Sequence, residues 1–353
     1  MVKHVVVLTE VDNGVGWIKI NRPKVLNSIN IEVVELVTEA LEKWKNDDRV
    51  VFVCLSGEGE KGFCAGGDMR KFYDLKNENI ESYANEFFSK EYRLDATIHH
   101  YKKPIMVYMN GVVMGGGVGL SIGGSHRIVT EKTKWAMPEM NIGFFPDVGA
   151  SFFLNQLPGY TGRYLALTSK VIPASDTIYM NVADYYMESA NWETIQSEMR
   201  TKQWSAESIM VDLDAFIQSY STETPGRSQL SVEKEEIERH FQFETVEEIV
   251  DSLQNAKAKG NEWAELTVKN ILSKSPTSLK VTLQQLINGQ SQSLLECLEM
   301  ERNMALHFME TADFYEGVRA VLVDKDHSPK WNPPSIAEVT NEDVEKYFSS
   351  IKV

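Results

Sequence analysis

The stretch that decides the fold runs from Tyr108 to Ala150 and reads YMNGVVMGGGVGLSIGGSHRIVTEKTKWAMPEMNIGFFPDVGA. In it, a strand-like apolar segment leads directly into three consecutive glycines, Gly115 to Gly117. Glycine at a strand-to-helix junction leaves the backbone amides uncovered and adopts positive φ at little cost. The stretch therefore predicts a backbone segment that a ligand can approach closely.

Two carboxylates follow in the same stretch. Glu139 comes directly after Pro138, and Asp147 comes directly after Pro146, each in otherwise apolar sequence. Taken singly, either acid fits a helix cap or the first turn of a helix. Taken together with a glycine loop, the two are candidates for a nucleophile, a general base or a proton donor.

A second glycine loop lies closer to the amino terminus. Gly66 and Gly67 follow Ala65 at the end of a glycine-rich loop from Ser56 to Asp68, which comes after the apolar run Val50 to Leu55. If both loops lie at one edge of the core, each offers one backbone N–H to the same oxygen atom, which is an oxyanion hole. The alternative is that these glycines only permit tight turns and close packing.

The remaining pattern predicts alternating strands and helices up to about residue 150, which is typical of an α/β core. Glu91 interrupts the apolar stripe of one predicted helix, so it is either paired internally or faces a cavity. Beyond Tyr160 helical periodicity dominates. We expect an α/β core with the active site over residues 1–200 and a helical region over 201–353. The predicted strands cover 5–9, 15–20, 50–55 and 104–109, and the predicted helices 31–44, 79–100, 246–257, 261–273, 277–288 and 292–309.

Composition excludes several classes of function. A net charge of −15 argues against a nucleic-acid partner. The three cysteines include no CxxC pair, so neither a disulfide framework nor a zinc site is indicated. The seven histidines show no spacing typical of a metal site or a nucleophilic triad. No apolar run approaches the roughly 18 residues of a membrane span. We expect a soluble, cytoplasmic protein with no membrane partner.

Several motifs together resemble the crotonase (enoyl-CoA hydratase/isomerase) superfamily. The resemblance spans about Val5 to Val339, and its carboxy-terminal motifs are the more specific ones, because shorter hydratases lack them. The motifs are NRPKVLN (21–27), FCAGGD (63–68), EYRL (91–94), MGGGVGL (114–120), PE (138–139), PDVG (146–149), SPTSLK (275–280), DFYEGVRA (313–320), DKD (324–326) and SPKW (328–331).

The resemblance implies a spiral core of repeated ββα units, followed by a helical region. It implies that the amides of Gly67 and Gly116 hold a thioester oxygen, and that Glu139 and Asp147 are the catalytic acids. The acyl part of the substrate is expected to contact Glu91, together with Gly116, Glu139 and Asp147. Coenzyme A is expected to contact Lys24, Val25, Leu26, Ala65, Gly66, Gly67 and Asp68.

One position separates the subgroups of this superfamily. Hydratases carry a second glutamate at the place that Gly119 matches, whereas this chain has its additional acid at Asp147. The resemblance therefore favours hydrolysis of a short, branched 3-hydroxyacyl-CoA thioester in valine breakdown, without a metal or redox cofactor. An enoyl-CoA hydratase or isomerase, and a non-catalytic relative acting as an interaction module, remain alternatives. The sequence does not fix the oligomeric state, and a homo-oligomer stays open.

Overall fold

The structure, a computed structural model, describes residues 5–351. They form two compact units. The first unit comprises residues 5–67, 90–135 and 172–231, and the second comprises residues 68–89, 136–171 and 232–351. Neither unit is one continuous stretch of chain. The division into 1–200 and 201–353 stays a prediction.

The strands form one large sheet and one small sheet. The large sheet has the order β1-β2-β3-β5-β7-β9, and the small sheet has the order β4-β6-β8. The strands are β1 (Val7–Asp12), β2 (Val15–Ile20), β3 (Phe52–Gly57), β4 (Gly62–Cys64), β5 (Ile105–Met109), β6 (Val112–Met114), β7 (His126–Val129), β8 (Lys134–Ala136) and β9 (Tyr185–Tyr186).

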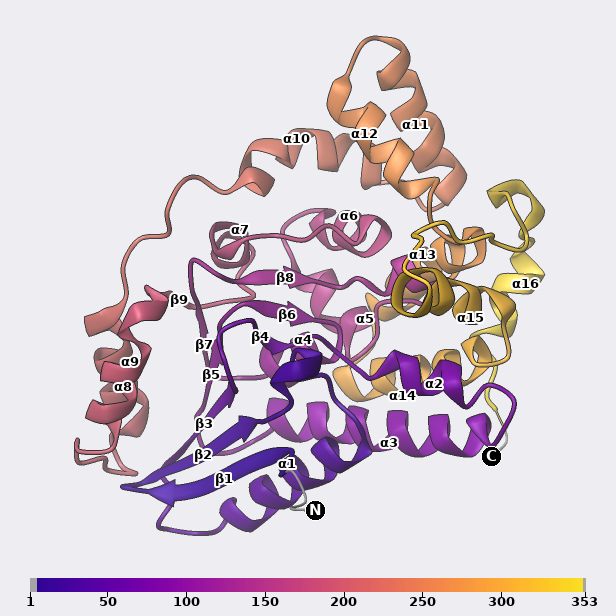
Figure 1. The fold of residues 1–353 in the computed structure, drawn as a ribbon. Coiled ribbons are helices and arrows are strands. Elements are labelled where there is room, and N and C mark those ends of the chain that lie inside the picture. Colours follow the sequence, from indigo (N-terminus) through magenta and orange to yellow (C-terminus); the bar gives the residue numbers. More distant parts are fainter. Residues whose placement is uncertain (1–4, 352–353) are drawn as a thin grey trace. The chain divides into compact units, whose positions relative to one another are not determined.

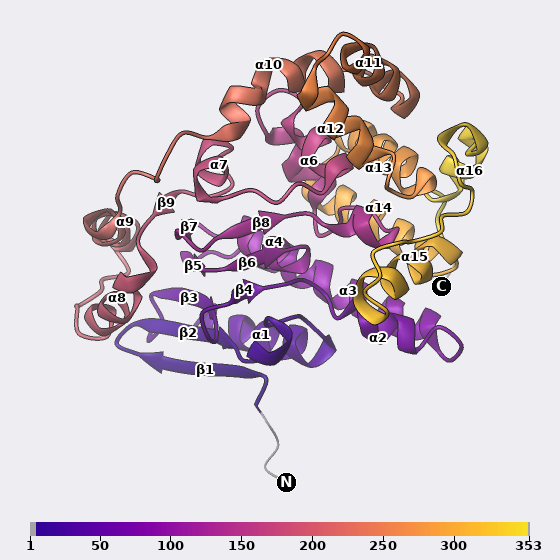
Figure 2. The ribbon, with the colours of Figure 1, turned by 45° about the horizontal axis from the view of Figure 1, so that its top comes forward.

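The order of the strands reveals a repeated ββα unit. In the pairs β3 and β4, β5 and β6, and β7 and β8, the first strand joins the large sheet and the second joins the small sheet. Figure 2 shows these pairs one above another. Within the large sheet β2, β3, β5, β7 and β9 run parallel. The predicted fold class, an α/β core of ββα repeats with a helical carboxy-terminal region, is confirmed.

The amino-terminal hairpin forms as the turn residues predict. β1 and β2 pair antiparallel with Asp12 opposite Val15. Between them, Asn13 and Gly14 have φ values of 48° and 82°, which are the left-handed values that a tight hairpin turn requires. The following helix, α1 (Ile31–Trp44), has the predicted bounds, and Asn30 caps it by accepting a hydrogen bond from the Val33 amide at 3.0 Å.

Both faces of the large sheet are covered. On one face, Val15, Trp17 and Phe52 pack in one core with residues of α8 (Trp192–Met199) and α9 (Ile209–Tyr220), the two helices beside the strands in Figure 1. On the other face, α1 approaches β2 so closely that a Cβ atom at Gly16 would lie 2.6 Å from the Trp44 ring. This burial explains why β3 and β5 read as continuous apolar runs.

One predicted loop contains a strand. We expected residues 56–68 to be irregular, but Gly62–Cys64 form β4 and pair parallel with β6. A strand of three residues is too short to show alternation in the sequence. The long helix predicted over 79–100 is α3 (Ile80–His99), and both units contribute residues to it.

Helices make up most of the second unit, and the four predicted carboxy-terminal helices are present within a few residues of their expected bounds. The remaining helices of the chain are α2 (Met69–Asp74), α4 (Gly116–Ile122), α5 (Ala150–Phe153), α6 (Thr161–Thr168), α7 (Ala174–Tyr179), α10 (Gln229–Phe241), α11 (Val246–Ala258), α12 (Glu262–Ile271), α13 (Pro276–Gly289), α14 (Leu294–Phe308), α15 (Ala312–Val318) and α16 (Asn341–Lys346).

A cluster of phenylalanines forms the aromatic centre of the second unit. Phe144 lies 5.3 Å from Phe308 and 5.6 Å from Phe314 between ring centroids, and Phe72 lies 5.2 Å from Phe87. These rings come from segments far apart in the sequence. They fix the segment that follows Glu139, since Phe144 and its neighbour Phe145 are fully buried.

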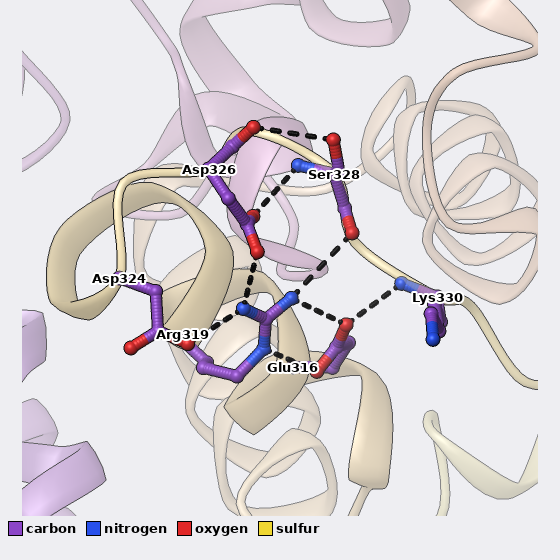
Figure 3. Close-up of polar contacts among 6 residues, drawn as sticks. All are labelled: Glu316, Arg319, Asp324, Asp326, Ser328 and Lys330. Atoms are coloured by element: carbon purple, nitrogen blue, oxygen red, sulfur yellow. Dashed lines mark hydrogen bonds and ion pairs between the residues drawn. The ribbon is translucent and has the colours of Figure 1, made fainter.

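A network of ion pairs holds the segment after α15. Arg319 contacts both carboxylate oxygens of Glu316 and also pairs with Asp324 and Asp326 at 2.7 Å each (Figure 3). Glu316 in turn accepts a hydrogen bond from the Lys330 amide at 2.8 Å. One guanidinium thus joins the DFYEGVRA, DKD and SPKW motifs.

Substitution of Gly16 tests the packing of α1 on the sheet. Gly16→Ala would place a methyl group 2.6 and 2.8 Å from two ring carbons of Trp44. We expect the free energy of unfolding to fall by about 1–3 kcal/mol, as for other overpacked sites. Urea denaturation measures this change. Lys19→Ala, on the same strand but partly exposed, is the control and is expected to stay within about 0.5 kcal/mol of wild type. An unchanged unfolding midpoint for Gly16→Ala would contradict the close approach.

Candidate active site

The two glycine loops lie side by side in the first unit. A Cβ atom at Gly66 would lie 3.3 Å from the Gly116 nitrogen, and a Cβ atom at Gly116 would lie 3.4 Å from the Gly67 nitrogen. Gly66 and Gly115 have φ values of 96° and 50°, which residues with side chains rarely adopt. Glycine is therefore needed here both for backbone conformation and for the short distance between the loops.

The Gly67 and Gly116 amides are suited to bind an external acceptor. Gly116 is the first residue of α4, and the first amides of a helix have no acceptor within the helix. Among the turn and loop hydrogen bonds of residues 5–351, neither amide donates to a backbone carbonyl. The predicted donors therefore come together, whereas their role as an oxyanion hole stays a prediction.

Glu91, on α3, borders the glycine loops. Its side chain is only 2% exposed. A Cβ atom at Gly116 would lie 2.5 Å from Glu91 Oε1 and 2.8 Å from the Ile29 side chain. Any residue larger than glycine at position 116 would displace this carboxylate or the loop itself.

The segment expected to contact coenzyme A is tied to the first glycine loop. The Ala65 amide donates to the Leu26 carbonyl at 3.0 Å, and the Ile29 amide donates to the Gly66 carbonyl at 2.8 Å. Lys24 and Val25 are exposed in the 3₁₀ turn η1 (Pro23–Val25). Two parts of the predicted surface for coenzyme A thus lie together. Asp68 belongs to the second unit, where it precedes α2.

The two predicted catalytic acids lie in the second unit, and both are buried. Glu139 begins the 3₁₀ turn η2 (Glu139–Ile142) and is 7% exposed, while Asp147 is 5% exposed. Glu139 Oε2 has no hydrogen-bond partner within the described chain. Burial raises the pKa of Glu139 well above its usual range, and the nearby charges of Asp147 and Glu301 raise this pKa further. This carboxylate is therefore suited to accept a proton.

Sequence reasoning missed Glu301, a third buried acid. It lies on α14 and is fully buried, with hydrogen bonds from Gly149 and from Ser151. Burial raises the pKa of Glu301 to about 8, although these hydrogen bonds lower it. Its sequence signal is the one that identified Glu91, an acid among apolar residues at helical spacing, here Cys297, Met304 and Ala305.

The second unit also contains a buried cation. Lys274 is 7% exposed, and its ammonium donates to Asn141 Oδ1 at 2.7 Å. Burial lowers the pKa of Lys274 to about 8. The hydrogen bond therefore anchors η2, which carries Glu139, to the residue that precedes the SPTSLK motif.

The fold also brings Asp214 to the adjacent residues Ser125 and His126, so that serine, histidine and aspartate side chains lie together. His126 contacts Ser125 Oγ at 2.8 Å and Asp214 at 3.3 Å. Ser125 Oγ, however, also accepts from the Ile105 amide at 3.0 Å and lies 3.2 Å from the Ile105 carbonyl oxygen. These backbone contacts assign Ser125 to the junction between β5 and β7.

Two further findings concern other classes of function. No group of three or more His, Cys, Asp or Glu side chains within residues 5–351 is arranged to hold a metal ion. No helix in the same range combines the length and the apolar character needed to cross a bilayer. That the protein needs no cofactor stays a prediction.

Comparisons with known proteins place this chain beside coenzyme A enzymes. A sequence profile described as enoyl-CoA hydratase/isomerase matches residues 15–348. The mitochondrial 3-hydroxyisobutyryl-CoA hydrolase of Bos taurus is 38% identical, over 98% of this chain and 89% of the relative. The protein of the same name from Danio rerio is 40% identical, over 98% of this chain and 90% of the relative.

Solved structures agree on the fold. A carnitinyl-CoA dehydratase from Mycobacterium thermoresistibile superposes with a TM-score of 0.90 at 37% identity, covering 99% of this chain and 97% of that chain. An enoyl-CoA hydratase from Rhodobacter sphaeroides superposes with a TM-score of 0.87 at 31% identity, covering 98% of this chain and 97% of that chain.

The expected cytoplasmic location is wrong on this comparison, because the hydrolases of Bos taurus, Danio rerio and Homo sapiens are all named mitochondrial. The expectation depended on reading the amino-terminal sequence as untargeted and on cysteines that fit a reducing compartment. Free thiols are compatible with any reducing compartment, so they do not single out the cytoplasm.

Glu139 should make stability depend on pH in a specific direction. Because its pKa is raised by folding, the native state binds more protons than the unfolded state between the usual carboxyl pKa of about 4.5 and the raised native pKa, so stability falls as pH rises through this interval. Glu139→Gln removes this term. We expect its free energy of unfolding to fall less steeply than that of wild type between about pH 5 and pH 8.

Urea denaturation across this pH range measures the two slopes. Glu299→Gln, an exposed change on α14, is the control and should leave the wild-type slope unchanged. Parallel curves for wild type and Glu139→Gln would show that burial does not raise the pKa of the Glu139 carboxylate.

Proposed function

The chain belongs to the enoyl-CoA hydratase/isomerase family, and from this premise we propose that it hydrolyses 3-hydroxyisobutyryl-CoA to 3-hydroxyisobutyrate and coenzyme A. Relatives with this activity in their names match almost the whole chain. The proposed reaction belongs to valine breakdown. The observation that carries the proposal is the buried pair Glu139 and Asp147, with glycine at position 119.

Position 119 argues against hydration, although the two solved structures with the highest TM-scores quoted above are titled as a hydratase and a dehydratase. Family hydratases use a second glutamate there to hold the water that is added to the double bond. Gly119 is buried inside α4 and supplies no carboxylate. The available second acid is Asp147, which lies on a different segment and whose charge raises the pKa of Glu139. A different second acid favours a different reaction of the same thioester.

We assign the donor loops to the thioester carbonyl. As a tetrahedral intermediate forms, negative charge develops on the carbonyl oxygen, and preorganised N–H groups stabilise that charge without reorganisation. The Gly67 and Gly116 amides would serve as these donors. Losing one donor of this kind costs about 10²–10³ in rate in other enzymes. Lys24, Val25, Leu26, Ala65, Gly66 and Asp68 are proposed to contact coenzyme A.

Glu139 is proposed either to attack the acyl carbon itself or to accept a proton from the attacking water. In one route its carboxylate attacks the acyl carbon, and water then hydrolyses the resulting anhydride. In the other route it removes a proton from the water that attacks directly. In either route the C–S bond breaks and coenzyme A leaves as a thiolate. Asp147 orients the water, or in its protonated form gives its own proton to the thiolate. The raised pKa of Glu139 suits the second route, because a stronger base removes the proton more readily.

Isotope labelling separates these routes. We expect a single turnover in oxygen-18 water to place the label in the product acid and to leave the protein unlabelled, as the general-base route requires. Mass spectrometry of the product and of the peptide containing Glu139 measures this. Label in the Glu139 carboxylate would contradict the general-base route and support the covalent one.

Glu91 is proposed to select the acyl group. Its buried carboxylate is an acceptor, and a 3-hydroxyl group on the substrate would supply the matching donor. A buried acceptor left without a donor penalises substrates that lack the hydroxyl. Assembly into a homo-oligomer also belongs to this proposal, and it does not affect the assignment of the residues.

Replacement of Glu139 tests the proposed reaction. We expect Glu139→Gln to release coenzyme A from 3-hydroxyisobutyryl-CoA at a rate reduced by about 10²- to 10⁴-fold, because the amide can neither accept a proton nor attack. Coenzyme A binding should change little. Thiol release measures the first quantity, and calorimetric titration with coenzyme A measures the second.

Glu299→Gln is the matched control and is expected to keep wild-type turnover. Wild-type turnover in Glu139→Gln would remove Glu139 from the mechanism. Loss of absorbance at the conjugated thioester of crotonyl-CoA without thiol release would instead establish the hydratase alternative. Binding of coenzyme A with neither reaction in the wild-type protein would support the non-catalytic alternative.

A further inference from the structure

The segment that carries Asp147 has an unfavourable backbone conformation. Val148 has a φ of 56°, and Gly149 has a φ of 88°. Glycine adopts such values readily, but a β-branched residue in the left-handed region is a genuine outlier. Conformations of this kind persist only where the surrounding structure enforces them. The contacts of residues 146–151 supply this constraint.

Two buried side chains, Glu301 and Gln285, hold this segment, and Ser151 within it bonds to both. Glu301 Oε2 accepts from the Gly149 amide at 2.7 Å, and Glu301 Oε1 accepts from the Ser151 amide at 2.8 Å and from Ser151 Oγ at 2.6 Å. Gln285 Nε2 donates to the Pro146 carbonyl at 2.6 Å and to Ser151 Oγ at 2.8 Å. We call Glu301, Gln285 and Ser151 the polar clamp.

The polar clamp forms hydrogen bonds to the backbone on both sides of Asp147. Gln285, on α13, holds the carbonyl of the residue immediately before Asp147. Glu301, on α14, holds the amide of the residue two positions after it. With Pro146 and Gly149 fixed, the backbone of Asp147 has little freedom. The directions in which its carboxylate can point are restricted as well.

The polar clamp is costly to bury. Glu301 and Gln285 are fully buried, and within residues 5–351 no Lys or Arg forms an ion pair with Glu301. Gln285 Oε1 has no hydrogen-bond partner in the same range. An apolar core of the same volume would avoid both penalties. Each such group in a folded protein requires an explanation, and positioning of a neighbouring group is one.

We propose that Glu301 is a positioning residue, which acts with Gln285 and Ser151 to hold Asp147 in the orientation that catalysis requires. This inference rests on the proposed function, because it assumes that Asp147 takes part in thioester hydrolysis. Glu301 itself does not touch the substrate in this scheme. It acts by accepting backbone hydrogen bonds from the segment that carries Asp147.

The shape and the two acceptor oxygens of Glu301 suit this role. Both carboxylate oxygens face N–H donors, so both must accept. In Glu301→Gln one oxygen is replaced by an NH₂ group, which then faces a backbone amide donor instead of accepting from it. The substitution keeps the volume of the side chain, but it removes the backbone hydrogen bond to one of the two oxygens. The segment is then expected to relax away from the strained conformation at Val148.

A comparison of Glu301→Gln with Asp147→Asn tests the inference. We expect Glu301→Gln to lower kcat for 3-hydroxyisobutyryl-CoA by about 10- to 100-fold, since a shift of about 1 Å at a catalytic group has effects of that size. Its KM and its affinity for coenzyme A should stay within about 3-fold of wild type, because no binding contact is removed. Glu299→Gln on the same helix is the control and should match wild type in all three quantities.

The double variant distinguishes positioning from general damage to the fold. If Glu301 acts through Asp147, adding Glu301→Gln to Asp147→Asn should not lower the residual rate any further. Independent losses that multiply in the double variant would overturn the inference. So would a wild-type kcat in Glu301→Gln while Asp147→Asn is inactive, and this result would leave the proposed function intact. Wild-type turnover in Asp147→Asn would remove Asp147 from the proposed function, and the inference would fall with it.

Ser151→Ala provides a second test if Glu301→Gln folds poorly. It removes one hydroxyl group, with its bonds to Glu301 and Gln285, and changes no charge. We expect a smaller loss of kcat, about 3- to 10-fold, again with KM unchanged and again absent on the background of Asp147→Asn. Thermal unfolding confirms that each variant compared is folded at the assay temperature. An unchanged kcat in folded Ser151→Ala would contradict the polar clamp.

Discussion

Removing carboxylates from water is the constraint on which the second unit depends. Glu139, Asp147 and Glu301 are each less than a tenth exposed, and two of them have raised pKa values for the same physical reason, which is burial. Charges in such a place destabilise a fold unless something else compensates. The compensation here is local. Glu301 collects backbone and hydroxyl donors, and the phenylalanine cluster around Phe144 supplies apolar burial beside them.

The ββα repeat explains why such different residues occupy related places. Gly67, Gly116 and Glu139 each come two or three residues after a strand of the small sheet, namely after β4, β6 and β8. After two of these strands glycine follows, and its amides are the proposed donors. After the third, glutamate follows proline, and its carboxylate is the proposed acid. In the proposed mechanism one structural unit thus provides donors in two repeats and an acid in another, without a change of fold.

Much of this arrangement could be predicted from local sequence. The hairpin at Asn13, the bounds of α1 and the burial of Glu91 follow from turn chemistry and helical spacing, which are properties of short segments. β4 could not be found, because three residues carry no period. The contact between Glu301 and Gly149 could not be predicted either, since the two residues are 152 positions apart and only the tertiary fold brings them together. The compartment was inferred wrongly, because the amino-terminal sequence was read as untargeted and because thiols report on redox conditions and not on an organelle.

The network around Arg319 sets the second unit's carboxy-terminal segment apart from its core. Its guanidinium is about a quarter exposed, and the carboxylates of Asp324 and Asp326 are roughly half exposed. Dissolved ions reach such charges and weaken their attraction over a screening length of about 8 Å at physiological ionic strength. Concentrated sulfate strengthens apolar burial instead. Salt therefore acts in opposite directions on the two parts of this unit. It weakens the ion pairs of Arg319 that hold the carboxy-terminal segment, and concentrated sulfate stabilises the packing of the aromatic centre.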